Sequence, residues 1–165
     1  MIVYLVGMPG SGKTTVGREV AGRLGVPFTD LDAEIERDAK RSVVELFADQ
    51  GEAAFRALEA RALLDASRHD PAVVACGGGV VLEPANRITL RNTGVCVFID
   101  VPLEQLRARV RPAADRPLIR ADGDLERLLA EREPLYREFA AHVVDGSGTP
   151  DGVADAIVEE LRWSA

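Results

Sequence analysis

The sequence predicts an α/β fold in which a five-stranded parallel sheet is flanked by helices within one domain, residues 1–165. Two observations predict it. Five short apolar runs alternate with longer segments of helical period, which is typical of repeated βα units. The first apolar run leads directly into a glycine-rich loop that has the spacing of a phosphate-binding loop. A chain of 165 residues can bury one real core and needs no second domain.

The five expected strands share an apolar, β-branched composition and are bounded by turn residues. They cover residues 2–6, 26–29, 72–76, 95–99 and 142–144.

The first helix is expected over residues 12–24, because Val16, Val20 and Leu24 share one face and Gly25 can end it. This apolar face should cover the sheet.

Two further helices are expected in the longest interval between strands. Ser42 and Glu45 form a capping box for one of them, and the other follows Gly51. The remaining helices are expected over residues 103–110, 125–141 and 153–162. Pro134 should break or kink the second of these three.

Residues 111–123 do not follow the pattern, because they are rich in arginine, proline and small residues and have no sustained period. A long loop in a compact domain is usually functional. We expect a mobile lid that closes over a nucleotide. A solvated connector is the alternative.

Residues 7–14 spell G-x-x-x-x-G-K-T directly after the first strand. Glycines at these positions let the backbone N–H groups point inward around an anion, and the following helix adds the positive end of its dipole. Lys13 can reach the β and γ phosphates, and Thr14 can ligate Mg²⁺. A turn that only joins strand to helix is the alternative. The expected nucleotide-binding residues in and after this loop are Gly10, Ser11, Gly12, Lys13, Thr14 and Thr15.

Charge argues against polyanionic partners. The 20 basic and 27 acidic residues give a formal net charge of −7, which repels nucleic acid and anionic membranes at long range. His69 and His142 are too few for a metal-ligand cluster, so a bound metal would be the Mg²⁺ that accompanies a nucleotide.

The chain is expected to be cytoplasmic. It has no signal-peptide pattern and no apolar stretch long enough to span a membrane. Cys76 and Cys96 each lie in an apolar run, which fits reduced, buried thiols, although a pairing between them stays open.

Asp30 and Asp32 follow the second strand, where alternation points both carboxylates to the same side. Ligands of open α/β sheets bind at the carboxyl ends of strands, so one aspartate can hold water on Mg²⁺ while the other meets an acceptor hydroxyl. Alternatively, Asp32 only caps the next helix. Asp100 competes with Asp30 for the metal role but is better suited to a turn.

Gly77, Gly78 and Gly79 offer unhindered backbone N–H groups at the same edge, where a substrate anion can rest. They can also serve only as a tight exit from the strand. Taken alone, Arg56 and Arg137 are ordinary surface arginines.

Taken together and in this order, these motifs resemble the shikimate kinase family over nearly the whole chain. Besides the phosphate-binding loop, they are D-x-D at 30–32, F-R-x-x-E at 55–59, G-G-G at 77–79, R-P-L at 116–118 and P-L-Y-R at 134–137.

The resemblance implies a P-loop fold like that of the nucleoside monophosphate kinases, with substrate-binding helices over about residues 33–68 and the lid over 111–123. It implies the transfer of phosphate from ATP, with Mg²⁺, to the 3-hydroxyl of shikimate in aromatic amino acid biosynthesis. The protein would act as a monomer on this small molecule.

The resemblance also implies roles for single residues around the acceptor. Asp32 would hold the diol of shikimate, Arg56 and Arg137 its carboxylate, and Gly78 and Gly79 would add backbone contacts. Whether Asp32 acts as a base or only orients the hydroxyl stays open.

On the nucleotide side, the resemblance assigns Lys13 and Arg116 to the transferring phosphoryl group. Asp30 would orient Mg²⁺ through water, alongside Thr14. Adenine would lie between Arg109 and a late loop that includes Pro150.

Two other functions remain open from the residues themselves. Another small P-loop kinase, acting on gluconate or on a nucleoside monophosphate, would use the same fold and Lys13. A nucleotide-dependent switch would bind nucleotide without acceleration by any small acceptor.

Overall fold

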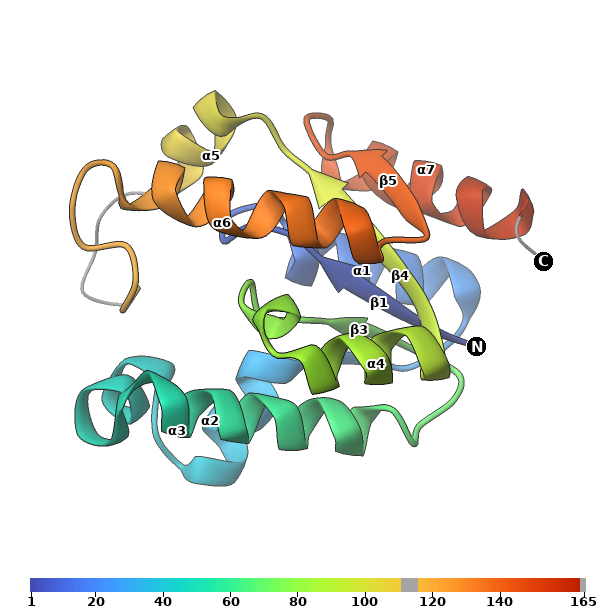
Figure 1. Ribbon diagram of the computed structural model, residues 1–165. Coiled ribbons are helices and arrows are strands. Elements are labelled where there is room, and N and C mark those ends of the chain that lie inside the picture. The colour runs from blue at the N-terminus through green and yellow to red at the C-terminus, as the bar shows by residue number, and fades with distance from the viewer. Residues whose placement is uncertain (111–115, 164–165) are drawn as a thin grey trace.

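A parallel β-sheet forms the centre of the molecule (Figure 1). The computed structural model describes residues 1–110 and 116–163. The sheet has five strands in the order β2-β3-β1-β4-β5, which confirms the predicted fold class. The strands are β1 (Ile2–Val6), β2 (Phe28–Asp30), β3 (Ala72–Ala75), β4 (Gly94–Asp100) and β5 (His142–Asp145). Each lies within two residues of its predicted bounds at either end.

The central strand β1 is buried along its whole length, because it pairs with β3 on one side and with β4 on the other. Its Leu5 lies opposite Ala75 and Val97 in these two pairings. All strands are parallel, so their carboxyl ends meet at one edge of the sheet, where loops can build a site.

Helices cover both faces of the sheet. Helices α1 and α7 pack together on one face, and α3, α4 and α6 lie on the other (Figure 1). The helices are α1 (Lys13–Leu24), α2 (Leu31–Ala39), α3 (Val43–Ala66), α4 (Pro84–Thr93), α5 (Leu103–Arg109), α6 (Asp124–Phe139) and α7 (Pro150–Trp163), with a 3₁₀ turn η1 (Val80–Leu82).

The two helices predicted on either side of Gly51 are present, and they form the two parts of α3 on either side of a kink at that glycine. Gly51 has φ 81° and ψ 173°, a conformation that side chains disfavour. The capping box is confirmed: the Ser42 hydroxyl accepts from the backbone N–H of Glu45, whose carboxylate accepts from the N–H of Ser42.

Two details differ from the prediction. Helix α6 continues through Pro134, so the expected break does not occur. Helix α4 was not predicted, because Pro84–Thr93 buries only Asn86 and Leu90 and therefore lacks a long apolar period. Pro84 occupies its first turn, where a missing N–H costs nothing.

A second, smaller apolar cluster lies apart from the main core and fixes the position of α3. It contains Ile35, Leu46 and Phe55, and Phe47 packs against it with its ring centroid 4.7 Å from that of Phe55. Because Arg56 follows Phe55 directly, this cluster sets where the Arg56 side chain begins.

No helix in the described part of the chain combines the length and the apolar character that a membrane crossing requires.

Candidate active site

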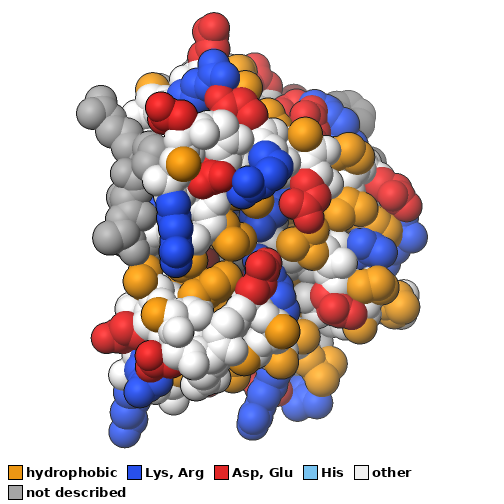
Figure 2. Space-filling model, turned by 60° about the vertical axis from the view of Figure 1, so that its left-hand side comes forward, with side chains coloured by type: hydrophobic (Ala, Val, Ile, Leu, Met, Phe, Trp, Pro, Cys, Tyr) orange, Lys and Arg blue, Asp and Glu red, His pale blue; other side chains and the backbone are white. Residues whose placement is uncertain are grey.

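A cavity of about 440 Å³ opens at the carboxyl ends of the strands. The face of the molecule toward this end is hollowed between an upper and a lower part (Figure 2). Most residues predicted for the site come together in its lining, namely Gly10, Gly12, Lys13, Thr14, Thr15, Asp30, Asp32, Arg56, Gly78, Gly79 and Arg116.

The phosphate-binding loop uses backbone conformations that only glycine adopts readily. Gly10 and Gly12 have φ of 81° and 87°, and a Cβ on Gly10 would collide with Val110. The backbone N–H of Ser11 donates to the carbonyl of Met8 at 3.1 Å and closes the turn, and Ser11 itself is buried behind it. The loop is therefore shaped before any ligand arrives.

Lys13 is the half-buried cation of this loop. Its Nζ donates to the carbonyls of Gly7 and Met8, both at 2.9 Å, and to the Ser11 hydroxyl at 3.3 Å. Burial lowers the pKa of Lys13 to about 8, and the nearby Asp32 opposes this shift. These carbonyls hold the ammonium group against the loop.

Thr14 and Asp30 provide neighbouring oxygens at the end of β2. The Thr14 hydroxyl donates to Asp30 Oδ2 at 2.5 Å. Asp30 Oδ1 accepts from the backbone N–H groups of Asp32 and Ala33, so Asp30, and not Asp32, caps α2. A hydroxyl and a carboxylate beside a phosphate-binding loop are the oxygen donors that Mg²⁺ prefers.

Asp32 is thereby free to face the cavity from the first turn of α2. Its Oδ1 is buried and has no hydrogen-bond partner. Burial and the neighbouring Asp30 raise the pKa of the Asp32 carboxyl, while Lys13 and Arg56 lower it.

Helix α3 contributes a buried ion pair to the same wall. Arg56 Nη1 donates to Glu59 Oε1 at 2.9 Å, and Glu59 is fully buried. Burial raises the pKa of Glu59, and Arg56 opposes the shift. Glu59 Oε2 and Arg56 Nε have no partner.

The glycine run lets these side chains approach the backbone closely. A Cβ on Gly77 would lie 2.7 Å from Glu59 Oε2 and 3.0 Å from Asp32 Oδ1. A Cβ on Gly79 would overlap the Arg56 guanidinium. The glycines are thus required for the shape of the cavity, beyond a simple exit from β3.

The arginine predicted on α6 is not in the cavity. Arg137 pairs with Asp100 and Glu133, its side chain is 46% exposed, and it does not line the cavity. Arg132, five residues earlier on α6, is 3% exposed and does line it, with a buried Nε that has no partner. Five helical residues turn the chain by about 140°, so the two arginines face different ways. The structure therefore places Arg132, and not Arg137, in the wall of this cavity.

The segment predicted to be a lid is described only from Arg116 onward, and its residues 111–115 lie outside the described part of the chain. Arg116 and Ile119 line the cavity, and Ile119 is 3% exposed. Arg109 donates to the Gly10 carbonyl at 3.2 Å, so it lies against the phosphate-binding loop, outside the cavity lining. Pro150 begins α7 and does not line the cavity either.

Both cysteines are free and buried, and Cys76 lines the cavity. Burial raises the pKa of the Cys76 thiol well above its ordinary value, so the group stays protonated.

Two buried charged residues of the cavity, Glu59 and Arg132, were not among the predicted site residues, although Glu59 belongs to the F-R-x-x-E motif at 55–59. Both had a readable signal. Each is a charged residue on the apolar stripe of an amphipathic helix: Glu59 is spaced by four from Phe55 and Leu63, and Arg132 by four from Leu128 and Tyr136. A charge on a buried stripe needs a partner, and a cavity supplies one.

Comparisons with known proteins agree with this geometry. The family model described as "Shikimate kinase" matches residues 9–162. A shikimate kinase of Aromatoleum aromaticum is 43% identical, over 98% of this chain and 95% of its own length. One from Halorhodospira halophila is 45% identical, over 97% and 93%.

Solved structures are similar over the same extent. Shikimate kinase from Acinetobacter baumannii in complex with shikimate superimposes with a TM-score of 0.95 at 35% identity, covering 99% of this chain and 93% of that one. A deoxyadenosine kinase from M. mycoides, at 15% identity and a TM-score of 0.66, shares the fold alone. With a family model that matches almost its whole length and relatives above 40% identity, this chain belongs to the shikimate kinase family.

Proposed function

We propose that this protein transfers the γ-phosphoryl group of ATP to the 3-hydroxyl of shikimate. The observation that carries the proposal is a set of four buried polar atoms without partners, all in the cavity wall: Asp32 Oδ1, Arg56 Nε, Glu59 Oε2 and Arg132 Nε. Two of the four are cationic donors and two are acceptors. A ligand with a carboxylate and hydroxyl groups satisfies both kinds.

The arginines fit the carboxylate end of such a ligand. Arg56 and Arg132 reach the cavity from α3 and α6. Guanidinium groups bind carboxylates through charge-assisted hydrogen bonds that fix orientation as well as charge. Gly78 and Gly79 add backbone N–H groups beside them, and Arg132 replaces Arg137 in this role.

Asp32 fits the hydroxyl end. Asp32 lines the cavity from the turn that Asp30 caps, and its buried Oδ1 has no hydrogen-bond partner among the described residues. We propose that this carboxylate accepts a hydrogen bond from the attacking hydroxyl and holds it in line with the γ-phosphorus. Proton acceptance at the same oxygen completes the transfer, because the product phosphate ester no longer carries that proton.

Lys13, Thr15 and the N–H groups of Gly10, Ser11 and Gly12 would hold the phosphates. Lys13 places positive charge where negative charge develops on the transferring group. Thr14 and Asp30 would hold Mg²⁺, Asp30 through water, and the ion neutralises phosphate charge when bound.

Arg116 completes the phosphate side from the lid. It lines the cavity with Ile119, whose burial closes this part of the lid against the core. A cation at this place stabilises the transition state and helps to exclude water from it. Arg109, which rests on the phosphate-binding loop, and Pro150 are proposed to flank the adenine.

The proposal is tested by measuring ADP release in a coupled assay with Mg²⁺ and ATP. The acceptors compared are shikimate, quinate, gluconate, a panel of nucleoside monophosphates, and none. We expect stimulation by shikimate above all others. Stimulation by a different acceptor would support kinase activity but contradict the roles proposed for the residues that bind shikimate. Nucleotide binding without any stimulation would favour a nucleotide-dependent switch.

We further propose that the protein works as a monomer in the cytoplasm. The support is that one chain supplies every residue assigned above, and that both cysteines are free thiols. Sedimentation of the purified chain at catalytic concentration tests the first point.

A further inference from the structure

Tyr136 links the glycine run of the cavity to the core. It lies on α6, is fully buried, and its hydroxyl donates to the carbonyl of Gly78. Its ring stacks on Phe98 of β4 with the centroids 5.1 Å apart and the planes inclined by 26°. Because the ring is held by the sheet, the position of the hydroxyl is held as well.

Arg132 lies one turn earlier on the helix, and its side chain lowers the pKa of the Tyr136 hydroxyl. Burial raises the pKa of Tyr136 to about 12, so the group remains a neutral donor at working pH. One hydroxyl thus donates to Gly78 and lies next to the side chain of Arg132.

Gly78 lies between Arg132 and the phosphate-binding loop. A Cβ at Gly78 would lie 3.0 Å from Arg132 Nη1 and 3.1 Å from Pro9 Cδ of the phosphate-binding loop. A shift of the Gly78 peptide would therefore disturb both Arg132 and Pro9.

The carbonyl of Gly78 and the N–H of Gly79 belong to one planar trans peptide, in which they point in opposite directions. A carbonyl held toward Tyr136 on α6 therefore turns the Gly79 N–H away from that helix. Gly79 itself lies in the cavity lining, next to the Arg56 guanidinium.

We propose that Tyr136 is a positioning residue for the acceptor carboxylate. Its hydroxyl sets the plane of the Gly78–Gly79 peptide and the direction of the Arg132 guanidinium, so that both donors converge on one carboxylate. It never touches the substrate. The inference rests on the proposed function, since it assumes that a carboxylated acceptor occupies this wall.

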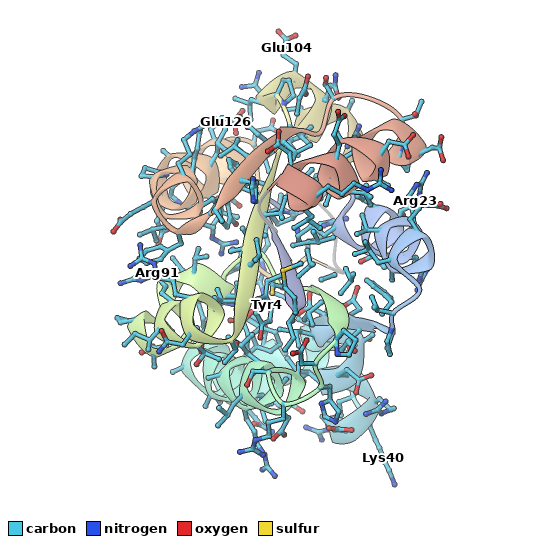
Figure 3. The ribbon with its side chains drawn as sticks, turned by 90° about the vertical axis from the view of Figure 1, so that its right-hand side faces the viewer. Tyr4, Arg23, Lys40, Arg91, Glu104 and Glu126 are labelled. Atoms are coloured by element: carbon cyan, nitrogen blue, oxygen red, sulfur yellow. The ribbon has the colours of Figure 1, made fainter. Side chains whose placement is uncertain are left out.

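The chain offers a matched control in its other tyrosine. Tyr4 is also fully buried, and its hydroxyl makes a 2.7 Å hydrogen bond with Thr93 Oγ1. It lies on the central strand β1 in the interior of the molecule, and it does not line the cavity (Figure 3). Tyr4→Phe and Tyr136→Phe therefore delete the same buried group, but only the second deletion is next to the site.

The experiment compares both variants with wild type in the coupled assay and by calorimetric titration of shikimate. The titrations use a saturating non-hydrolysable ATP analogue, whose binding also stabilises a weakened fold by mass action. We expect Tyr136→Phe to raise the KM and Kd for shikimate roughly tenfold, the loss of about one good hydrogen bond to a charged group. The KM for ATP should stay within about twofold, and Tyr4→Phe should leave both constants within about twofold.

The outcomes separate the inference from the function. A wild type that does not turn over shikimate would contradict the proposed function. An active wild type with an unchanged shikimate KM in Tyr136→Phe would overturn the positioning role alone. Equal losses for shikimate and ATP, or a Tyr4→Phe variant that behaves like Tyr136→Phe, would also overturn it, because both indicate general weakening of the fold. A Tyr136→Phe chain that stays unfolded even with the ATP analogue would overturn it for the same reason.

Discussion

The two halves of the cavity satisfy their buried polar groups in different ways. In the phosphate half, the Lys13 ammonium has three protein partners, and both oxygens of Asp30 accept hydrogen bonds. In the acceptor half, Asp32, Arg56, Glu59 and Arg132 each keep a buried atom without a partner, and these are all the unpaired buried side-chain atoms of the described residues.

This difference indicates which half is complete in itself. An unsatisfied buried polar group costs about 1–3 kcal/mol, so the acceptor half stores a cost that the correct ligand relieves. The phosphate half has no such unpaired atom among the described residues and is preorganised for phosphate groups. Selectivity for the substrate is therefore expected to reside in the acceptor half, which contains the buried polar atoms without partners.

The strongest test of the phosphate half is Lys13→Ala. We expect turnover to fall by at least about a thousandfold, because the transferring phosphoryl group loses its cation. The coupled assay measures this directly. Lys40→Ala is the control, since Lys40 is the other lysine of the chain and projects away from the molecule at the end of α2 (Figure 3). A comparable loss in both variants would contradict the role of Lys13.

The acceptor half is tested by a pair of arginines on one helix. Arg132→Ala should weaken shikimate binding by about 2 kcal/mol, or ~30-fold in KM, with little change in the KM for ATP. Arg137→Ala should change the shikimate KM by less than about threefold, because this exposed residue pairs with Asp100 and Glu133. The reverse order of effects would restore the sequence-based choice of Arg137.

The pH profile of kcat/KM for ATP should distinguish the two halves by the sign of their pKa shifts. Lys13 must be charged to act, and burial lowers its pKa to about 8, so activity should fall as pH rises through that value. Asp32 must be ionised, and burial raises its pKa, so the acidic limb should lie above the ordinary range of an aspartate.

Saturating ATP should move the basic limb of kcat upward, since phosphate stabilises the charged Lys13. Lys13→Arg, where it retains activity, should abolish that limb, because guanidinium does not titrate in this range. A basic limb that stays near 8 in Lys13→Arg would assign the titration to another group.

The smallest effects come from two glycines in α1, the helix behind the phosphate-binding loop. A Cβ at Gly22 meets nothing within 4 Å, so Gly22→Ala should stabilise the fold by about 0.5–1 kcal/mol without changing kinetics. A Cβ at Gly17 would lie 2.5 Å from the Phe28 ring, so Gly17→Ala should destabilise by about 1–3 kcal/mol. Thermal unfolding measures both. Equal shifts would show that the helix does not pack on Phe28 as described.

The phosphate half could be predicted from the sequence because its chemistry is contiguous. Eight successive residues contain the glycines, the cation and the hydroxyl, and the strand before them identifies the context. Asp30 and Asp32 were also predictable, since they follow a strand at the edge of the sheet where ligands bind, although Asp32 lies in the first turn of α2 and not in an extended chain. Only the structure shows which of the two aspartates caps α2, and it is Asp30.

The acceptor half was harder to predict because its members come from helices that are distant in sequence. The family resemblance led to an arginine near P-L-Y-R, but the choice between Arg132 and Arg137 depends on which face of α6 meets the cavity. The apolar stripe of α6 carries that information and includes Arg132. The contact of Tyr136 with Gly78 spans 58 residues of sequence and has no local signal.

The N-cap of α2 has a consequence for how enzymes of this design can change their substrate. Asp30 caps the start of the helix, and Asp32 follows two residues later in the same turn. One short piece of backbone therefore sets the distance between the phosphoryl donor and the acceptor hydroxyl. Substitutions that move this piece of backbone would misalign the reacting atoms for every substrate. Helices α3 and α6 carry no such constraint, and their inward side chains can be exchanged while the reacting atoms stay in line. New acceptor preferences are therefore expected to evolve through α3 and α6, on an unchanged α2.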